Sequence, residues 1–337
     1  MSYDVITIGD AMRDIFLFPS LEEMERPVEG EKIHPKESFE EFLVFGLGDK
    51  ITVSDVAFSI GGTANNVAVG LARLGLKVGI CTALGGDNAG REIEEQISKK
   101  NVDTAYIRTY RGQHSSFSVI VSYKGERTIF VYHAFGPDNF KLPDNPQTKW
   151  IYLGPMAEGY DRIFNQIVSL KVKENIKVAI NPGAVQIEKG MHTFGGLLRM
   201  IDVIFLNRQE AEDISGLRGG VPTVKELART IHLEGPKMVV ITAGKDGAYA
   251  FDGIDFFRVG AYPGHRLDAT GAGDAFASAY LAAIASGEEM QTALKWGVTN
   301  SASVIGKIGA QEGLLGKGVV KRRVKEYKWP ADTLRFS

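Results

Sequence analysis

The chain has 337 residues, of which 44% are hydrophobic and 24% are charged. This composition is typical of a globular protein with an extensive core, and it excludes disordered and collagen-like chains. The 39 lysine and arginine residues are balanced by 41 aspartate and glutamate residues. There is therefore no overall basic field to attract nucleic acid or an anionic membrane, and we expect a small-molecule ligand held by local contacts.

The sequence indicates a cytoplasmic protein. Its single cysteine, Cys81, can form no internal disulfide and cannot hold zinc alone, so we expect it to be buried. The N-terminus reads MSYDVITIGD, in which Asp4 stands where a signal peptide carries positive charge. The longest apolar helical stretch, 275–287, is about half as long as a membrane span.

Short runs rich in β-branched residues recur along the chain and end at glycine or polar residues, as buried strands do. These runs are 5–9, 77–83, 150–153, 177–180, 202–206 and 237–242. Segments with helical spacing lie between them, such as Val67, Leu71 and Leu74 before Gly75. The alternation predicts one doubly wound α/β domain over 1–337 with a mostly parallel sheet.

Two regions, about 16–59 and 104–133, interrupt this alternation. Within the second region, 117–121 and 128–132 alternate between apolar and polar residues like half-exposed strands. We expect the two regions to pair as a small β-sheet. Such a sheet would form a lid over the carboxyl ends of the main strands, where open α/β sheets bind ligands.

The segment LDATGAGDAFASAYLAAIASG, 267–287, carries the strongest chemical signal. Its second half has helical spacing, and Gly271 and Gly273 precede it in a loop. Backbone amides in such a loop approach an anion closely, and the helix N-terminus adds partial positive charge. Asp274 then lies beside the anion, where it can accept a proton from an attacking hydroxyl. The alternative is a tight turn in which Asp274 only caps the helix.

DATGAGDAF at 268–276 and IGGTANNVAVGLARLG at 60–75 together resemble the two signatures of ribokinase-like (pfkB) carbohydrate kinases. The resemblance runs from Val5 to about Gly313 and implies an αβα sheet with a β lid. It implies an ATP-dependent sugar kinase in which the amides of Gly271, Ala272 and Gly273 form an anion hole and Asp274 is the base.

The same resemblance assigns sugar contacts to Gly61, Gly62 and Asn66, although Asn66 could instead cap the helix that follows. It also assigns the sugar-binding aspartate to Asp14. Asp10 is a weaker candidate, since an aspartate directly after a strand commonly closes a turn. Ribokinases proper usually have asparagine where this chain has Met12, so ribose itself is a weaker expectation.

On the nucleotide side, the resemblance implies contacts with ATP and ions. It gives phosphate contacts to Thr242, Gly244 and Gly247, although a simple hairpin turn would need the same glycines. It gives an adenine contact to Asn300, and NPG at Asn181 lines the same cleft. Asn207 and Glu210, in LNRQE, organise Mg²⁺, or Asn207 only caps the helix that follows. Asp268, Thr270 and Gly309 stand where relatives bind a monovalent cation such as K⁺. The serine that completes that site in relatives is Gly313 here.

Other nucleotide-binding folds lack support, because the chain has no G-x-x-x-x-G-K-[ST], no H-R-D and no G-x-G-x-x-G after its first strand. We expect the six histidines to be surface or packing residues: 34, 114, 133, 192, 232 and 265. A sugar- or nucleotide-binding sensor without turnover is the non-enzymatic alternative.

The sequence favours an unphosphorylated acceptor, because Thr63 stands where relatives that take sugar phosphates often have lysine. A nucleoside is the second candidate, since the phenylalanines of the lid could stack on a base: Phe39, Phe42, Phe45 and Phe58. The same rings could pack within the lid or against a second subunit in a homodimer. Four cations of the second region would instead favour a phosphorylated acceptor: Arg108, Arg111, Lys124 and Arg127.

Overall fold

The computed structural model describes residues 2–19, 48–123, 126–217, 220–329 and 335–336. Its main sheet has ten strands in the order β14-β13-β12-β11-β10-β9-β8-β1-β4-β5. Seven of them, from β11 to β5, are parallel, and β12, β13 and β14 extend one edge in antiparallel fashion. The strand bounds are β1 Tyr3–Ile8, β4 Val78–Gly85, β5 Val102–Tyr110, β8 Thr148–Leu153, β9 Lys177–Ile180, β10 Val203–Asn207, β11 Val239–Thr242, β12 Ala248–Phe251, β13 Phe256–Val259 and β14 Arg335–Phe336.

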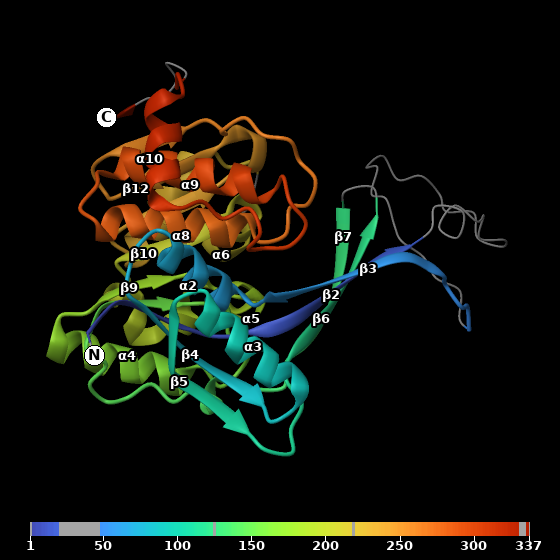
Figure 1. Cartoon of the computed structure of the whole chain (residues 1–337). Coiled ribbons are helices and arrows are strands. Elements are labelled where there is room, and N and C mark those ends of the chain that lie inside the picture. Colours follow the sequence, from blue (N-terminus) through green and yellow to red (C-terminus); the bar gives the residue numbers. More distant parts are fainter. Residues whose placement is uncertain (1, 20–47, 124–125, 218–219, 330–334, 337) are drawn as a thin grey trace.

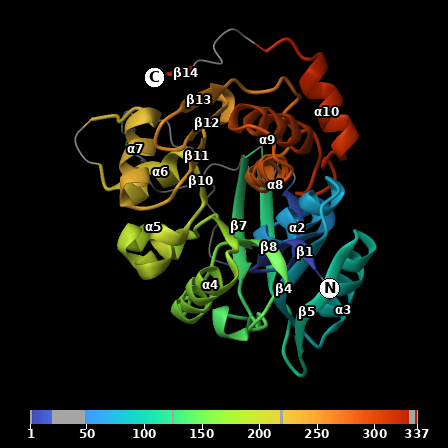
Figure 2. The same ribbon diagram turned by 90° about the vertical axis from the view of Figure 1, so that its left-hand side faces the viewer.

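Helices cover both faces of this sheet (Figures 1 and 2). One face carries α2 Thr63–Arg73, α3 Asn88–Lys99, α8 Ala272–Ala285, α9 Met290–Val304 and α10 Lys317–Glu326. The other carries α4 Asp161–Glu174, α5 Ala184–Lys189, α6 Arg208–Ser215, α7 Val224–Glu234 and the 3₁₀ segment Met191–Met200. The predicted doubly wound α/β class is confirmed, and each of the six predicted strands is present to within two residues.

A second sheet of four strands in the order β3-β2-β6-β7 projects from the body (Figure 1). Its strands are β2 Met12–Pro19, β3 Val53–Gly61, β6 Phe117–Tyr123 and β7 Glu126–Tyr132, and we call it the lid. The expected lid region 104–133 begins too early, because Val102–Tyr110 pairs with β4 as the edge strand of the main sheet. The lid also begins at Met12, immediately after β1, rather than at residue 16.

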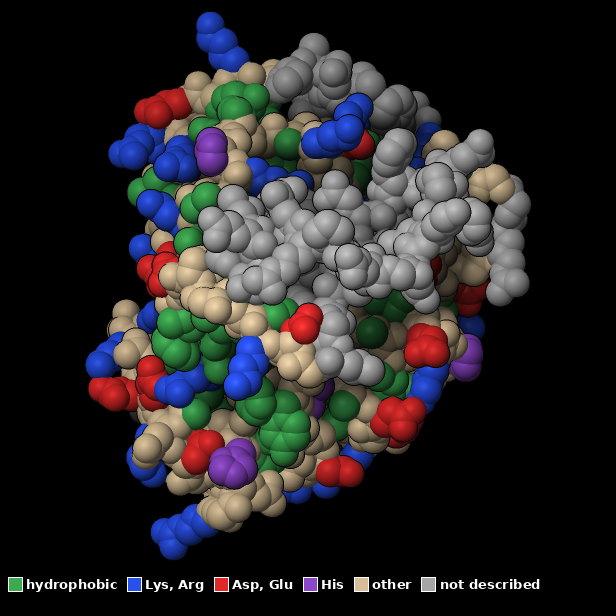
Figure 3. All heavy atoms as spheres, turned by 90° about the vertical axis from the view of Figure 1, so that its right-hand side faces the viewer, with side chains coloured by type: hydrophobic (Ala, Val, Ile, Leu, Met, Phe, Trp, Pro, Cys, Tyr) green, Lys and Arg blue, Asp and Glu red, His purple; other side chains and the backbone are tan. Residues whose placement is uncertain are grey.

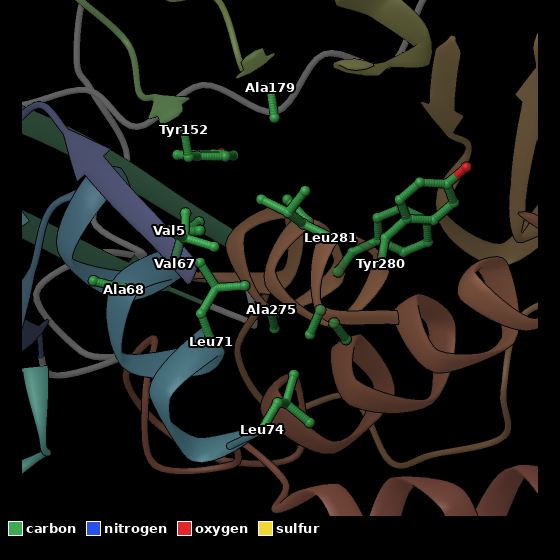
Figure 4. Close-up of a cluster of buried hydrophobic side chains, with 14 of the residues drawn as sticks. Val5, Val67, Ala68, Leu71, Leu74, Tyr152, Ala179, Ala275, Tyr280 and Leu281 are labelled. Atoms are coloured by element: carbon green, nitrogen blue, oxygen red, sulfur yellow. The ribbon is translucent and has the colours of Figure 1, made fainter. Parts of the chain in front are cut away.

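The core under α2 and α8 brings the two halves of the chain together (Figure 4). Leu71 and Leu74 from α2 are buried with Leu281 from α8, above Val5 of β1. The helices approach closely because Gly70 has no side chain; a Cβ there would overlap Ser278 Oγ. This packing places the first turn of α2 beside the first turn of α8.

The structure also bears on Cys81 and on the length of the apolar helices. Cys81 is fully buried in β4, as expected. Within the described ranges, no helix combines the length and apolar character needed to cross a membrane.

Candidate active site

The N-terminus of α8 stands between two pockets. The lid pocket, of about 240 Å³, lies between the lid and the first turns of α2 and α8; its polar lining includes Asp10, Asp14, Asn66, Ser118, Arg127, His133 and Asp274. The loop pocket, of about 150 Å³, lies on the other side; its lining includes Thr242, Gly244, Gly247, Tyr262, Gly273, Phe276 and Ser301. Residues 271–274 therefore face two separate spaces within a few residues of each other.

Asp274 lies in the first turn of α8 and faces the lid pocket. Asn66 Nδ2 donates a hydrogen bond to Asp274 Oδ2 at 2.8 Å. Burial raises the pKa of Asp274 to about 6, whereas hydrogen bonds from Asn66 and Thr63 act in the opposite direction. A carboxylate with this pKa is ionised at neutral pH and still basic enough to accept a proton from a hydroxyl.

The paired glycines before α2 allow two aspartates to come close. A Cβ at Gly61 would overlap Asp14 Oδ2, and one at Gly62, which has a φ of 91°, would overlap the carbonyl of Asp10. Gly62 is itself the N-cap of α2. Asn66 therefore does not cap the helix, and its amide is hydrogen-bonded to Asp274 and Gln311. Asn65 Nδ2 donates to the Gly61 carbonyl.

Asp14 is 6% exposed and lies on the lid face that looks into the pocket. Ser118 donates its hydroxyl to Asp14 Oδ1 at 2.6 Å across the β2–β6 pair. Burial raises the pKa of Asp14 to about 6 despite this hydrogen bond. A half-satisfied carboxylate in this position is suited to accept hydrogen bonds from ligand hydroxyls.

The lid adds a histidine and an arginine that were not expected to act together. In β7 and the residue after it, Arg127, Ile129, Val131 and His133 alternate onto one face and all line the pocket. His133 Nδ1 lies 2.8 Å from Asp10 Oδ2, and this hydrogen bond raises the pKa of His133. His133 is exposed, as expected of a surface residue, but it also lines the lid pocket. Its period-2 spacing from Arg127 was the available signal.

The loop expected to form the anion hole is a tight glycine turn before α8. Gly271 has a φ of 75°, and a side chain there would overlap Ala310, so only glycine fits this turn. Gly273 faces open space in the loop pocket. The amides at the start of a helix have no intrahelical acceptor, but the Ala272 N–H donates to the Ala269 carbonyl at 3.3 Å. Gly273 is the expected amide donor with the clearest access to a ligand.

The sequence profile of the pfkB family carbohydrate kinases matches residues 27–315. This chain belongs to that family. It is 26% identical over 285 residues to the 5-dehydro-2-deoxygluconokinase of Shouchella clausii, covering 79% of this chain and 86% of the relative. It is 24% identical over 278 residues to the ribokinase of Haemophilus influenzae, covering 79% and 88%. The structure of Arabidopsis thaliana ribokinase complexed with ribose and ATP has the same fold, with TM-score 0.76 and 20% identity over 97% of this chain and 100% of the other.

Membership in the pfkB family confirms the resemblance and the expected class of enzyme. Two residues expected on the nucleotide side, Asn300 and Asn181, make hydrogen bonds within the protein instead. Thr242, Gly244 and Gly247 line the loop pocket, as expected. Asn300 does not, because it is fully buried: its Nδ2 donates to the Ala275 carbonyl and its Oδ1 accepts from Leu315 N–H. Its neighbour Ser301 lines the pocket instead. Asn181 is likewise occupied by a hydrogen bond to the Phe205 carbonyl.

Asn207 and Glu210 form a capping box at the start of α6. Asn207 Oδ1 accepts from Glu210 N–H at 2.9 Å, and Glu210 Oε2 accepts from Asn207 N–H at 2.8 Å. Burial raises the pKa of Glu210, and its charge acts on Asp274. No group of three or more His, Cys, Asp or Glu side chains is placed to hold a metal among the described residues. A single carboxylate with an adjacent amide fits Mg²⁺, which keeps several waters and is bound largely through substrate phosphates.

The residues expected to bind a monovalent cation do not fit that role in this structure. Asp268 Oδ1 accepts hydrogen bonds from both the amide and the hydroxyl of Thr270, and Oδ2 accepts from Gly309 N–H at 3.2 Å. A side chain at Gly313, where relatives have serine, would overlap the Ser303 carbonyl. The carboxylate ties two loops together, and the residue that would complete the cation site is absent.

The residues that bear on the choice of acceptor lie in different parts of the molecule. Phe58 is 65% exposed and pairs with Ile15, on the face of the lid opposite Asp14, so it does not stack in the lid pocket. Arg108 lies in β5 and Arg111 in the turn after it. Of the three cations that the structure describes, Arg127 is the one that lines the pocket. Phe39, Phe42, Phe45 and Lys124 lie outside the described residues.

The raised pKa of Asp14 predicts a pH-dependent stability. A carboxyl with a folded pKa of about 6 binds more protons when folded than when unfolded, so its stabilising effect is lost as the pH rises from about 4 to 6. Asp14→Asn removes this effect and keeps a polar partner for Ser118. We expect urea unfolding to show the variant more stable than wild type at pH 8, by on the order of 1–3 kcal/mol, and no advantage near pH 4.

The control is Asp144→Asn, which replaces an exposed carboxylate and should show no such trend. An Asp14→Asn variant less stable than wild type at pH 8 would contradict this account.

Proposed function

We propose that the protein transfers the terminal phosphoryl group of ATP to a hydroxyl of a sugar, with Asp274 as general base. The observation that carries the proposal is the position of 271–274 between the two pockets, with the Asp274 carboxylate in the lid pocket and Gly273 in the loop pocket. A sugar on one side and the ATP phosphates on the other would meet at this helix N-terminus.

In this arrangement the acceptor hydroxyl gives its proton to Asp274 as its oxygen forms the new bond to phosphorus, and ADP leaves. The positive end of α8 and the amide of Gly273 stabilise the negative charge of the transferring group. Asp14, Asn66 and the Asp10–His133 pair hold the sugar by its other hydroxyls. Mg²⁺, when bound near Asn207 and Glu210, supplies neutralisation of the phosphate charge.

Two alternatives receive less support. Among the described residues that line the lid pocket there is no Phe, Tyr or Trp, so a ring that would stack on a nucleobase is lacking there. A sensor without turnover has no use for a carboxylate whose pKa burial raises to about 6 beside the anion site. Binding of ATP and sugars without any ATP consumption would favour the sensor.

Asp274→Asn tests the base. The amide cannot accept the proton, so we expect kcat to fall by roughly 10²–10⁴ while both KM values change little. In the wild type, kcat should fall as the pH drops below about 6, because the base must be ionised and its pKa is about 6. Coupled assay of ADP release measures both effects, with Asp144→Asn as the control. Wild-type turnover in Asp274→Asn would remove Asp274 from this role.

A carboxylate-bearing sugar is a second candidate for the acceptor, and Arg127 is the observation that favours it. Its side chain is exposed and lines the lid pocket, and His133 lies on the same face of the lid. A guanidinium binds a carboxylate through two parallel hydrogen bonds. The relative from Shouchella clausii is named for a sugar acid. A carboxylate carries one negative charge and needs fewer neighbouring cations than a phosphate monoester, which carries roughly two. A sugar acid is therefore compatible with the prediction that the acceptor is not phosphorylated.

Arg127→Met separates acidic from neutral acceptors. If Arg127 binds a carboxylate, the variant should raise KM for the best sugar acid by at least about tenfold, equivalent to one charge-assisted hydrogen bond. KM for neutral sugars should change by less than about threefold. Arg111→Met, outside the pocket, is the control. A wild-type enzyme that prefers a neutral sugar, with Arg127→Met silent, would exclude the acidic acceptor and leave the kinase assignment in place.

We also propose a homodimer through the outer face of the lid. That face carries exposed apolar side chains, among them Val56, Phe58, Phe117, Phe130 and Tyr132. Apolar side chains are also visible in separate patches among polar ones on this side of the molecule (Figure 3). An exposed apolar sheet face of this kind is typical of an interface.

Sedimentation velocity should show a dimer for the wild type and a monomer for Phe130→Glu, because a buried charge without a partner is unfavourable. Leu233→Glu, at an exposed apolar site on α7 away from the lid, should remain dimeric. A monomeric wild type would refute the proposal.

A further inference from the structure

Asp274 is the last member of a chain of hydrogen bonds that begins outside the lid pocket. Asn66 Nδ2 donates to Asp274 Oδ2 at 2.8 Å. Gln311 Nε2 donates to Asn66 Oδ1 at 2.8 Å, and Lys100 Nζ donates to Gln311 Oε1 at 2.6 Å. Two neutral amides therefore connect the ammonium group of Lys100, which lines another cavity, with the carboxylate of Asp274 in the lid pocket.

The direction of this chain is fixed at its outer end. A carboxamide side chain has one accepting end, the oxygen, and one donating end, the amino group. Where the surroundings allow, the group can be turned so that these two ends exchange places. Lys100 only donates, so it holds Gln311 Oε1. The Ile60 carbonyl only accepts, and it holds Gln311 Nε2 at 2.9 Å. Both contacts require the same orientation of the Gln311 amide.

The orientation of Gln311 then determines that of Asn66. With Nε2 of Gln311 directed at Asn66, the side of the Asn66 amide that faces Gln311 must be its oxygen. The amino group is left to face Asp274. Asn66 is 5% exposed and Gln311 is 6% exposed, so water cannot easily replace a lost partner, and an amide turned the wrong way would leave buried groups unpaired.

We propose that Gln311 is a positioning residue for the catalytic base: it fixes the Asn66 amide so that its amino group faces Asp274, and Lys100 fixes Gln311. The proposal rests on the proposed function, since it takes Asp274 as the base. It assigns a role in the reaction to two residues that contact neither pocket's ligand directly.

The charges determine whether the group that faces Asp274 favours its ionised or its protonated form. A donor facing Asp274 stabilises the ionised carboxylate, whereas a carbonyl oxygen in the same place would stabilise the protonated acid. Other groups also act on Asp274: Thr63 on α2, Asp14 on β2 and Glu210 on α6, with Asp10, Arg127 and His133 around the pocket. Gln311 hydrogen-bonds Asn66, Ile60 and Lys100, so its replacement reaches the base through Asn66.

The test measures kcat against pH for wild type, Gln311→Glu and Gln311→Met. Loss of the Gln311 donor should shift the acidic limb of the profile to higher pH by about 0.5–1 unit, as expected when a carboxylate loses a hydrogen-bond donor. A shift of one unit from a midpoint near pH 6 lowers kcat about fivefold at pH 6 but by less than about twofold above pH 8. KM for both substrates should stay within about twofold.

This pattern distinguishes positioning from a purely structural role. Gln311 also holds the loop at 309–315 against β3, and a loop that merely loosened would lower kcat at every pH or raise KM. Gln311→Met adds no charge, so a shift in that variant reports the orientation of Asn66 alone. Gln96→Glu places the same new charge on another residue of the cavity that Lys100 and Gln311 line, and it should leave the limb unmoved.

Lys100 provides an independent measurement. Lys100→Met should shift the limb in the same direction by a smaller amount, about 0.3 unit, because the Ile60 carbonyl still holds Gln311. Lys100→Arg should restore the wild-type profile. If neither Gln311 variant folds, as judged by thermal melting, the Lys100→Met profile decides, and an unmoved limb overturns the proposal.

The outcomes for the two proposals are separable. A wild-type protein that consumes no ATP with any sugar refutes the proposed function. An active wild type whose acidic limb is the same in folded Gln311→Glu and Gln311→Met refutes only the role of Gln311. A limb that moves equally in Gln96→Glu would show that a nearby charge, and not the amide, caused the shift.

Discussion

The hydrogen bond from Asn66 to Asp274 joins the first turns of two helices that are 208 residues apart in the sequence. It can form only if α2 and α8 begin at the same point above the sheet. Their close approach depends on Gly70, where a side chain would overlap Ser278. Both helices then direct unpaired N–H groups and partial positive charge toward the same small space. The two pockets meet there, so the site is a consequence of how these helices pack.

That space is occupied by carboxyl groups that are costly to bury. Asp14 and Asp274 both have a pKa of about 6 because burial disfavours their charged forms. Asp14 can approach because Gly61 has no side chain, and a Cβ there would overlap the carboxylate. An amide at either position would be easier to bury, so the carboxylates reduce stability in return for basicity and hydrogen-bond acceptance. Enzymes commonly carry such a local conflict between stability and activity.

The sequence was sufficient to predict the parts of the fold that depend on local pattern. Continuous β-branched runs predicted the central parallel strands, and the glycine loop before an apolar helix predicted the position of Asp274. The strands at the edges of the main sheet were harder to predict. The strands β5, β12 and β13 either alternate between apolar and polar residues or are short, so in the sequence they resemble loops. The lid region expected at 104–133 therefore includes most of Val102–Tyr110, although the pairing of this segment with β4 makes it a main-sheet strand.

Side-chain partners across long sequence distances could not be predicted from one sequence. Asn300 has the residue type of an adenine contact, yet it bridges α8 and the loop before α10. Gln311 and Lys100 showed no motif, because their role depends on a contact with Asn66 that only the folded chain creates. His133 belongs to the same class: its partner Asp10 is 123 residues away. Residue type indicates which interactions are available, and tertiary packing decides which of them form.

The lid shows how one strand pattern can serve two surfaces. Alternation in β7 directs Arg127, Ile129 and Val131 into the pocket and Phe130 and Tyr132 outward. A slip of one residue would exchange the two sets, so the register of the lid must be held firmly. The hydrogen bond from Ser118 to Asp14 contributes on the inner face by holding β6 in register with β2, and β7 in turn pairs with β6. Asp14 therefore helps to hold the lid together and also lines the pocket, so one carboxylate contributes to both the structure and the proposed binding surface.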